Sequence, residues 1–388
     1  MLLRVDFNVP LNDKGEIVDD TRLREALPSI RHILDQGGSV ILMSHLGRPK
    51  SKRDPKFSLK PCATWLASHL SHPVHFVDDC IGEEVERRAA HLKKGEVLVL
   101  ENLRFYPAEE DPSLDPTFAK RLSQLADFYV NDAFGTAHRV HSSTATITQH
   151  FPGRAAAGHL MQKELSFLGP LLKDPKRPFY AIIGGSKISS KIGVLKSLLS
   201  KVDGMFIGGG MAYTFLKAQG IPIGDSIYEE GHLKTAKEFL QESQRKKVPL
   251  HLPIDVVIAD RFSEDAQEKI ILTSEGIPDG WQGMSVGPQT VHAWEREMQG
   301  ARTVFWNGPL GVYEFPRFAT YTQEFARILA RLHATTIVGG GDSVAAVNAL
   351  HLGDKFSHLS TGGGASLELL EFGHLPGVDA LSDYAIDN

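Results

Sequence analysis

The sequence has little cysteine and no long apolar run, and both absences narrow the class of protein. Cys62 and Cys80 are the only cysteines among 388 residues, and neither belongs to a CxxC pair or lies near a histidine pair with zinc-binding spacing. We therefore expect two buried, reduced thiols. No run approaches the roughly 18 apolar residues that span a bilayer, and the opening residues lack a signal peptide's apolar stretch. These absences predict a cytoplasmic protein with no membrane partner.

An excess of basic residues is also absent. The net charge is -5 and the isoelectric point is near 6.4, whereas a general nucleic-acid binder normally carries a basic excess. The predicted partners are therefore small molecules and not nucleic acid. A composition of 42% hydrophobic and 23% charged residues is that of an ordinary globular protein. The length exceeds what one hydrophobic core usually supports, so we expect two domains.

Short apolar runs alternate with amphipathic stretches along the chain, a pattern typical of parallel sheets with crossover helices. The predicted fold is α/β, with two doubly wound parallel-sheet (Rossmann-like) domains joined by an interdomain helix and hinge. Leucines at helical spacing place that helix at residues 160–174, and the DPKRP sequence ends it. The strands are expected at residues 2–7, 39–44, 96–101, 127–132, 179–183, 204–208, 253–259, 303–307, 335–339 and 357–360.

Glycine clusters follow strands four times in the second half, as GGSK (184–187), GGGM (208–211), GGGDS (339–343) and GGGAS (362–366). Glycine allows the backbone to approach an anion closely, and a helix start presents free N–H groups to it. One such cluster can be merely a tight turn, but four at the carboxyl edge of a sheet indicate a phosphate site. Neither GxGxxG nor GxxxxGK[ST] occurs, so the site is neither a standard dinucleotide fingerprint nor a P-loop.

Four charged side chains accompany these glycines. Lys187 and Lys191 are four residues apart at an expected helix start, which would put both ammonium groups on one face, although surface lysines are commonly spaced this way. Asp342 follows the third cluster and could be a helix cap or a magnesium ligand. Glu314, in WNGPLGVYEF (306–315), could accept hydrogen bonds from nucleoside hydroxyls.

Basic side chains take the place of glycine clusters at the strand ends of the first half. They are Arg22, His45, Arg48, Arg104 and Arg139. Arginine binds carboxylate and phosphate bidentately, so the group predicts a site for a multiply charged anion, although each arginine alone could form an ordinary salt bridge. Asp6 and Asn8 follow the first strand and could bind substrate hydroxyls. His138 and His141 flank Arg139 but receive no general-base role, because histidines also cap loops and fill polar pockets.

Several motifs, spread over nearly the whole chain, show that the chain resembles the phosphoglycerate kinase family. They are RVDFNVP (4–10), SHLGRP (44–49), LENLRF (100–105), NDAFGTAHR (131–139), GGSKISSK (184–191), WNGPLGVYEF (306–315), GGGDS (339–343) and STGGGASLELLE (360–371).

The resemblance implies reversible, magnesium-dependent phosphoryl transfer between ATP and 3-phosphoglycerate by a monomer that closes at a hinge. Residues 1–159 would bind 3-phosphoglycerate, 175–374 would bind nucleotide, and 375–388 would return to the first domain. The implied substrate-binding residues are Asp6, Phe7, Asn8, Arg22, His45, Leu46, Gly47, Arg48, Arg104 and Arg139. The implied nucleotide-binding residues are Lys163, Gly185, Lys187, Lys191, Gly209, Gly210, Asn307, Pro309, Glu314, Gly340, Gly341, Asp342 and Ser343. Asp342 would ligate Mg²⁺, and the catalytic residues would be Arg22, Lys191, Gly340 and Gly363.

The chain departs from the family pattern at two places, and two other functions are weighed against the one that the resemblance implies. Ser190 stands where many relatives have aspartate, and Phe372 and Gly373 stand where relatives usually read Gly-Lys. Another kinase without a P-loop would also use glycine turns and lysines, but the separate arginine group argues against it. A nucleotide-sensing protein on the same fold is disfavoured because Lys191 and Asp342 are present beside all the arginines.

Overall fold

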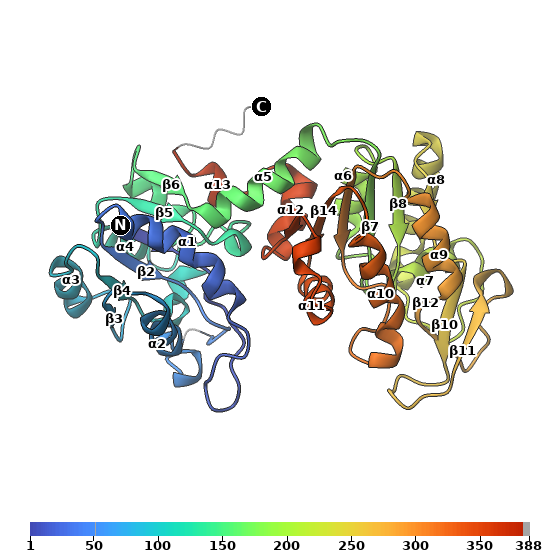
Figure 1. Ribbon diagram of the computed structural model, residues 1–388, viewed down its shortest axis with the longest axis horizontal. Coiled ribbons are helices and arrows are strands. Elements are labelled where there is room, and N and C mark those ends of the chain that lie inside the picture. The colour runs from blue at the N-terminus through green and yellow to red at the C-terminus, as the bar shows by residue number, and fades with distance from the viewer. Residues whose placement is uncertain (51, 383–388) are drawn as a thin grey trace. The chain divides into compact units, whose positions relative to one another are not determined.

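The computed structural model describes residues 1–50 and 52–382. The chain divides into two compact units: unit 1 is Met1–Ser166 together with the chain from His374, and unit 2 is Phe167–Gly373 (Figure 1). The chain passes from one unit to the other within helix α5 (His159–Lys173), where the interdomain helix was expected. Residues 383–388 of the expected C-terminal tail lie outside the described residues.

Unit 1 is built on a six-stranded sheet with the order β3-β4-β2-β1-β5-β6, and every pair is parallel. The strand order reverses direction beside β1, which lies between β2 and β5. Ligands of open α/β sheets bind at such a switch point, beyond the carboxyl ends of the strands. The strands are β1 (Leu2–Arg4), β2 (Val40–Met43), β3 (Val74–Phe76), β4 (Val97–Val99), β5 (Tyr129–Asn131) and β6 (Ala155–Ala157).

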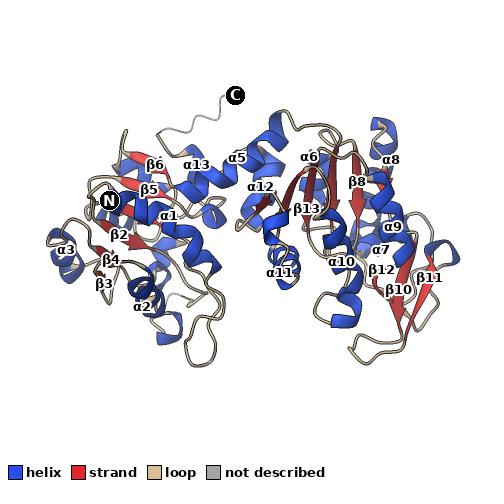
Figure 2. Ribbon diagram, in the orientation of Figure 1, coloured by secondary structure: helices blue, strands red, loops and turns tan. Residues whose placement is uncertain are grey.

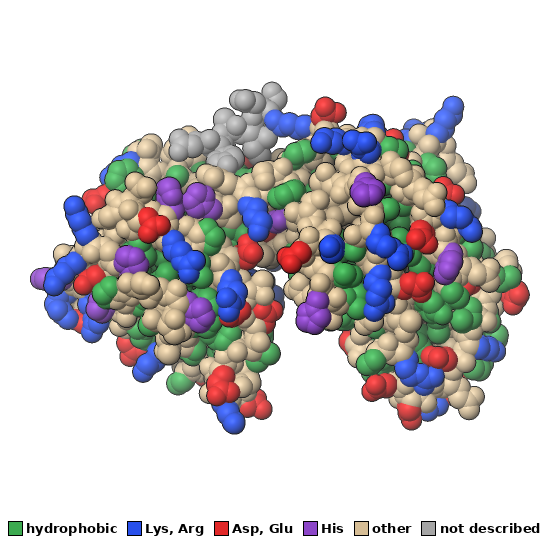
Figure 3. Space-filling view, in the orientation of Figure 1, with side chains coloured by type: hydrophobic (Ala, Val, Ile, Leu, Met, Phe, Trp, Pro, Cys, Tyr) green, Lys and Arg blue, Asp and Glu red, His purple; other side chains and the backbone are tan. Residues whose placement is uncertain are grey.

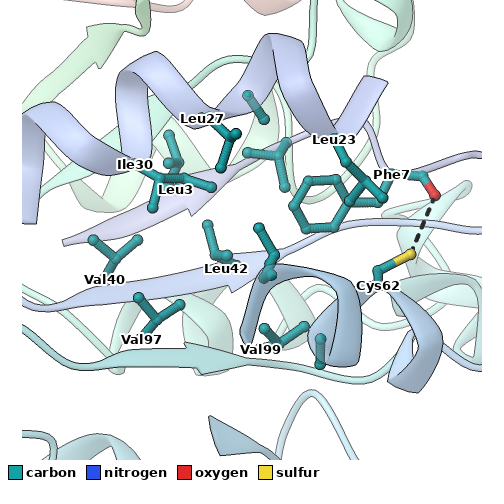
Figure 4. Packing of buried hydrophobic residues seen from close by; sticks show 14 of the residues in the cluster. Leu3, Phe7, Leu23, Leu27, Ile30, Val40, Leu42, Cys62, Val97 and Val99 are labelled. Carbon is teal, nitrogen blue, oxygen red and sulfur yellow. Dashed lines mark hydrogen bonds between the residues drawn. The ribbon is translucent and has the colours of Figure 1, made fainter. Parts of the chain in front are cut away.

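Helix α1 (Thr21–Asp35) covers the core of unit 1 because its apolar residues recur on one face. Leu23, Leu27 and Ile30 point at strand residues that include Leu3 and Leu42 (Figure 4). Each such buried side chain stabilises the unit by about 1.5–3 kcal/mol relative to exposure. The other helices of the unit are α2 (Lys60–His69), α3 (Glu83–Ala90), α4 (Phe118–Ser123) and α13 (Pro376–Asp379), with 3₁₀ turns η1 (Pro55–Phe57), η2 (Leu103–Phe105), η3 (Pro107–Glu109), η4 (Phe134–Thr136) and η5 (Thr146–His150).

Unit 2 contains a second six-stranded parallel sheet, with the order β15-β14-β13-β7-β8-β9, and a separate antiparallel sheet, with the order β11-β10-β12 (Figure 2). The parallel strands are β7 (Phe179–Ile183), β8 (Gly204–Ile207), β9 (Leu250–His251), β13 (Thr303–Asn307), β14 (Thr335–Gly339) and β15 (His358–Leu359). The antiparallel strands are β10 (Asp255–Ala259), β11 (Glu268–Leu272) and β12 (Gln282–Val286).

Helices connect the parallel strands of unit 2, and most of them begin just after a strand's carboxyl end. They are α6 (Ile192–Leu198), α7 (Met211–Ala218), α8 (Leu233–Lys246), α9 (Pro288–Glu297), α10 (Pro316–Leu329), α11 (Gly341–Ala349) and α12 (Gly364–Phe372), with 3₁₀ turns η6 (Glu230–His232), η7 (Thr273–Glu275) and η8 (Gly353–Lys355). No helix in the described part of the chain is long and apolar enough to cross a membrane.

The predicted fold class is confirmed, with one correction to a strand's sheet. All ten expected strands are present, but the strand expected at 253–259 is the centre of the antiparallel sheet and not a member of the parallel one. Its residues are fully buried, so its apolar run looks like that of a parallel core strand. The sequence did not reveal the short strands β3, β6 and β9 or the hairpin partners β11 and β12. The β6 sequence is three alanines, which have low strand propensity.

Candidate active site

The glycine turns of unit 2 line a pocket with a volume of about 700 Å³ at the carboxyl ends of β7, β8, β13 and β14. Of the predicted nucleotide and catalytic residues, those that line it are Gly185, Lys191, Gly209, Gly210, Asn307, Pro309, Glu314, Gly340, Gly341, Asp342 and Gly363. The pocket therefore brings together residues from all four glycine clusters.

Close backbone packing explains why two of these turns need glycine. A Cβ atom at Gly184 would lie 2.1 Å from the carbonyl oxygen of Pro309. Gly209 has a φ of +69°, and a Cβ there would lie 2.7 Å from the backbone nitrogen of Gly185. Both positions are therefore closed to any side chain. The turns meet backbone against backbone and leave the space beyond them for a ligand.

Lys191 and Asn307 form the polar centre of the pocket. The Lys191 ammonium group donates a hydrogen bond to the Asn307 side-chain oxygen. Burial lowers the pKa of Lys191 to about 8, although the negative charge of Asp342 opposes that shift. Asn307 is 1% exposed, and its Nδ2 has no hydrogen-bond partner among the described residues. A cation and an unused donor side by side suit an anionic oxygen.

The turn that carries Asn307 is held by two buried contacts. Trp306 donates its indole N–H to the carbonyl oxygen of Gly308 at 2.8 Å. The Ser343 hydroxyl accepts a hydrogen bond from the Gly308 N–H at 2.7 Å. Ser343 is fully buried and does not line the pocket, so this contact fastens the Asn307 turn to the start of α11.

Asp342 lies in the first turn of α11 with its side chain exposed to the pocket. Gly340 is the N-cap of this helix, and no side chain caps it. Within the described residues, the Asp342 carboxylate makes no hydrogen bond or ion pair, so helix capping does not occupy its oxygens. No cluster of three or more His, Cys, Asp or Glu residues in the described ranges could hold a metal ion. Asp342 could therefore hold a cation only as one ligand among others, such as phosphate oxygens.

Lys187 and Lys163, two of the predicted nucleotide-binding lysines, do not line the pocket. Lys191 is the N-cap of α6, so Lys187 lies in the preceding turn, and the expectation of one shared helical face is wrong. The Ser190 hydroxyl closes this turn by donating to the Lys187 carbonyl oxygen at 2.9 Å, and the Lys187 side chain is exposed outside the pocket lining. Lys163 belongs to unit 1, where its ammonium group lies 3.1 Å from the Glu25 carboxylate.

An apolar wall of the pocket was not found from the sequence. It is formed by Tyr213, Ile227, Phe262, Met284 and Val312. Phe262 and Ile227 are 59% and 49% exposed, so both side chains are accessible to a ligand in the pocket. They come from different connections, so no local spacing pointed to them. A flat apolar ring, such as a nucleobase, suits this wall.

In unit 1, Asp6 and Arg22 form an ion pair beyond the carboxyl end of β1. Burial by itself raises the pKa of Asp6, but the neighbouring polar groups, of which the Arg22 guanidinium group has the largest effect, lower the pKa to about 2. The backbone N–H of Asn8 also donates to Asp6, at 3.1 Å. Asp6 is therefore a permanent anion that fixes the direction of Arg22.

A second set of contacts orders the loop after β2. The Gly47 N–H donates to the Asn8 side-chain oxygen at 2.8 Å, and the Gly47 carbonyl oxygen accepts from Arg104 at the same distance. Arg104 also lies 3.2 Å from Glu110, and its Nε has no partner among the described residues. Phe7 and Leu46 are buried beneath this surface and serve the core. The loop thus presents Asn8, Gly47 and Arg104 together.

Beneath the basic side chains lies a buried charge network that the sequence did not reveal. Arg4 is fully buried, and its guanidinium group lies 3.1 Å from His45 Nδ1, 2.8 Å from the Ser143 hydroxyl and 3.9 Å from the Glu109 carboxylate. Ser143 in turn donates its hydroxyl to Glu109 at 2.6 Å. Burial lowers the pKa of His45 well below its usual range, so the ring is neutral at neutral pH. Arg4 looks like a strand residue in the sequence, and only tertiary contacts reveal its role.

The remaining predicted basic side chains of unit 1 lie at its surface. Arg48 and Arg139 are exposed, and Arg139 donates to His138 Nε2 at 2.9 Å. Burial lowers the pKa of His138 to about 4 and that of His141 to about 3. All three histidines near this site are therefore neutral, and the arginines carry its positive charge. On the face shown in Figure 3, basic and acidic side chains are otherwise intermixed over each unit.

Comparison with known proteins assigns the family. The family model described as "Phosphoglycerate kinase" matches residues 1–373. Phosphoglycerate kinase of Moorella thermoacetica is 54% identical over 383 residues, covering 99% of this chain and 96% of that protein. Cytosolic phosphoglycerate kinase of Triticum aestivum is 53% identical over 386 residues, covering 99% and 95%.

Solved structures agree with these matches. Phosphoglycerate kinase from Coxiella burnetii superposes with a TM-score of 0.87 at 39% identity, covering 98% of this chain and 95% of that one. The enzyme from Pyrococcus horikoshii OT3 gives a TM-score of 0.84 at 30% identity, with the same coverage. The fold and these relatives define an α/β phosphotransferase with a carboxyl group as acceptor. The chain belongs to the phosphoglycerate kinase family, whose known reaction is the glycolytic phosphoryl transfer between ATP and 3-phosphoglycerate.

Proposed function

We propose that the pocket of unit 2 binds the nucleotide and that the basic surface of unit 1 binds 3-phosphoglycerate. The observation that carries the proposal is the contrast between the two sites. The unit 2 pocket combines an apolar wall with glycine turns and Lys191, as a nucleoside polyphosphate requires. The unit 1 site has several guanidinium groups and the polar side chains of Asp6 and Asn8, which suit a small hydroxylated molecule with two anionic groups.

The proposed chemistry in unit 2 is stabilisation of charge on the transferring phosphoryl group. Lys191 supplies a cation, and Asn307 Nδ2 supplies a donor with no other partner among the described residues. The N–H groups near Gly340 and Gly363, at the starts of α11 and α12, face the same pocket. Preorganised donors of this kind act without reorganisation when charge develops, so each removal typically costs about 10²- to 10³-fold in turnover.

The acceptor needs no general base in this proposal. The carboxylate of 3-phosphoglycerate is already ionised at neutral pH, so positioning and charge neutralisation suffice. The lowered pKa values of His45, His138 and His141 support this reading, because burial keeps all three rings neutral. Neutral rings add no charge of their own to the site. Arg22, held by Asp6, would then neutralise the acceptor side of the reaction.

The residues of the pocket fit a magnesium ion carried by the nucleotide. Asp342 offers carboxylate oxygens that make no hydrogen bond among the described residues, and Mg²⁺ commonly uses one or two carboxylates together with substrate phosphates. When bound, Mg²⁺ would neutralise phosphate charge and orient the polyphosphate. Asp342 would hold it, while Lys191 and Asn307 would contact phosphate oxygens.

Transfer also requires the two ligands to meet without water, because the acyl phosphate product hydrolyses readily. We therefore include hinge closure of the two units in the proposal. We further propose that the protein is a monomer that acts in the cytoplasm. Two relatives whose names describe them as cytosolic support the cytoplasmic location.

A coupled assay tests this function directly. ATP, Mg²⁺ and 3-phosphoglycerate are mixed with the protein, excess glyceraldehyde-3-phosphate dehydrogenase and NADH, and NADH absorbance is followed. The proposal expects NADH consumption that depends on both substrates and is lost when Mg²⁺ is chelated. Nucleotide binding without turnover would instead favour a nucleotide sensor.

A further inference from the structure

Residues 226–229 form a short segment that borders the unit 2 pocket, and we call it the pocket strap. At one end, the Ser226 hydroxyl accepts a hydrogen bond from the Gly283 N–H at 2.8 Å. In the middle, the Ile227 side chain lines the pocket beside Gly283. At the other end, the Glu229 N–H donates to the hydroxyl of Thr214, a fully buried residue of α7, at 3.1 Å. The strap is thus fastened to two walls of the pocket.

The Glu229 side chain extends from this strap to the turn that carries the lysines. Its carboxylate accepts one hydrogen bond from the Ser189 N–H at 2.8 Å and another from the Ser189 hydroxyl at 2.6 Å. The first turn of α6 contains no acidic residue, and its N-cap, Lys191, makes no side-chain capping bond. Glu229 bonds Ser189, two residues before the N-cap, so it fastens the turn that leads into this helix and does not cap the helix itself.

The position of Ser189 makes this contact relevant to the phosphate site. It lies between Lys187 and Lys191, and the turn is closed locally by the Lys191 N–H, which donates to the Ile188 carbonyl oxygen at 2.9 Å. Fixing both the backbone and the side chain of Ser189 limits the directions that the flanking lysines can take. Lys187, Ser189 and Ser190 are exposed, whereas Ile188 is fully buried and anchors the turn from below. The hydrogen bonds to Glu229 therefore hold the exposed side of the turn.

The Glu229 carboxylate could affect nucleotide binding either through its charge or through its hydrogen bonds to Ser189. A carboxylate close to two lysines and a polyphosphate repels the ligand, so by charge alone its removal would strengthen nucleotide binding. Its hydrogen bonds to Ser189 act in the opposite direction, because they order donors that the ligand would otherwise have to order on binding. The two roles therefore predict opposite effects for one substitution.

We propose that Glu229 is a positioning residue that holds the 187–191 turn so that Lys187 and Lys191 meet the nucleotide phosphates. This inference rests on the proposed function, since it takes the unit 2 pocket to be the nucleotide site. Glu229 itself contacts no reacting atom. It acts through Ser189, and it links the apolar side of the pocket, by way of Ile227, to the phosphate side.

The test measures binding of MgATP and of adenosine by calorimetry to the parent, Glu229→Ala, Glu229→Gln and Glu230→Ala. Glu230 is the matched control, because its carboxylate makes no hydrogen bond or ion pair within the described residues. We expect Glu229→Ala to weaken MgATP about tenfold and to leave adenosine within about twofold. Glu229→Gln, which retains an acceptor, should stay within about threefold of the parent, and Glu230→Ala within about twofold.

Three outcomes would overturn the inference. The first is MgATP binding by Glu229→Ala that is unchanged, which would show that the hydrogen bonds to Ser189 do not matter, or tighter, which would show that the charge of Glu229 dominates. The second is an equal loss for adenosine and MgATP, which would show that Glu229 only supports the pocket wall. The third is a loss in Glu229→Gln as large as in Glu229→Ala. If the parent chain itself bound no MgATP, the proposed function would fail and not merely this inference.

Discussion

The two proposed anion sites of this molecule are built from opposite kinds of groups. In unit 1, guanidinium groups form the site, and each of the inner ones is held by a partner such as Asp6, Gly47 or Glu109. In unit 2, glycine turns form most of the pocket, and Lys191 with Asn307 supplies its polar centre. A site made of side chains can lose one donor at a time, whereas a site made of backbone is closed by a single added methyl group.

These kinds of groups match the ligands that each unit is proposed to bind. Several guanidinium groups can select a small molecule with two anionic groups by the spacing of those groups. A flexible polyphosphate chain is better followed by N–H groups, which can line a continuous surface. The comparison predicts which ligand each substitution affects. A substitution in one unit that weakened binding of the other unit's ligand would contradict it.

The largest effect is expected from Lys191→Met. Turnover should fall about 10²- to 10³-fold in the coupled assay, because the cation beside the transferring group is lost. Folding should not suffer. The pKa of Lys191 is lowered from 10.5 to about 8, so below pH 8 the folded protein holds a disfavoured charge, which corresponds to about 3 kcal/mol.

The pH dependence of the unfolding free energy gives a separate check on Lys191. Stability contributed by this group rises as pH increases from about 8 towards 10.5, where only the unfolded chain keeps the proton. Lys191→Met should therefore be at least as stable as the parent at pH 7 in urea unfolding. Turnover within about threefold of the parent would remove Lys191 from the mechanism.

Arg104→Met should raise the KM for 3-phosphoglycerate by about tenfold to a hundredfold and leave the KM for MgATP unchanged. Its guanidinium group bonds Gly47, and its Nε has no other partner among the described residues. Arg121→Met on α4 is the control and should match the parent. A rise in the KM for MgATP instead would contradict the division of ligands between the units.

Gly209→Ala tests the backbone site in the same way. The added Cβ would lie 2.7 Å from the backbone of Gly185, and the φ of +69° is unfavourable for alanine. We expect nucleotide affinity to fall by about tenfold or more while 3-phosphoglycerate affinity is retained. Gly231→Ala, whose Cβ would meet nothing within 4 Å, is the control. Calorimetry with each ligand separates the two results, and full nucleotide affinity in Gly209→Ala would show that the turn can relax.

The sequence predicted the backbone site better than the side-chain site. Glycine clusters at strand ends are visible because only glycine permits the φ of Gly209 or the close contact at Gly184. The Arg4 network was missed because Arg4, Glu109 and Ser143 are far apart in sequence and meet only in the folded unit. The 253–259 strand was placed in the wrong sheet for a similar reason, since its burial does not reveal its neighbours.

The effect expected from Asp6→Asn concerns stability and not the choice of ligand. A pKa held at about 2 instead of 3.8 means that the charged carboxylate stabilises the folded protein by about 2 kcal/mol. That stability is fully present above pH 3.8 and is lost as pH falls through about 2. Asp6→Asn should therefore lower the unfolding free energy at pH 7, and the difference should shrink on acidification. A difference that stayed constant with pH in urea unfolding would mean that the ion pair with Arg22 contributes nothing.

The most direct test of the account is a map of backbone amide shifts by NMR, with each ligand added alone to the whole chain. The account predicts that MgATP shifts the signals of Gly185, Gly209 and Gly340, and that 3-phosphoglycerate shifts those of Asn8, Gly47 and Arg104. Shifts from both ligands confined to the same unit would contradict it.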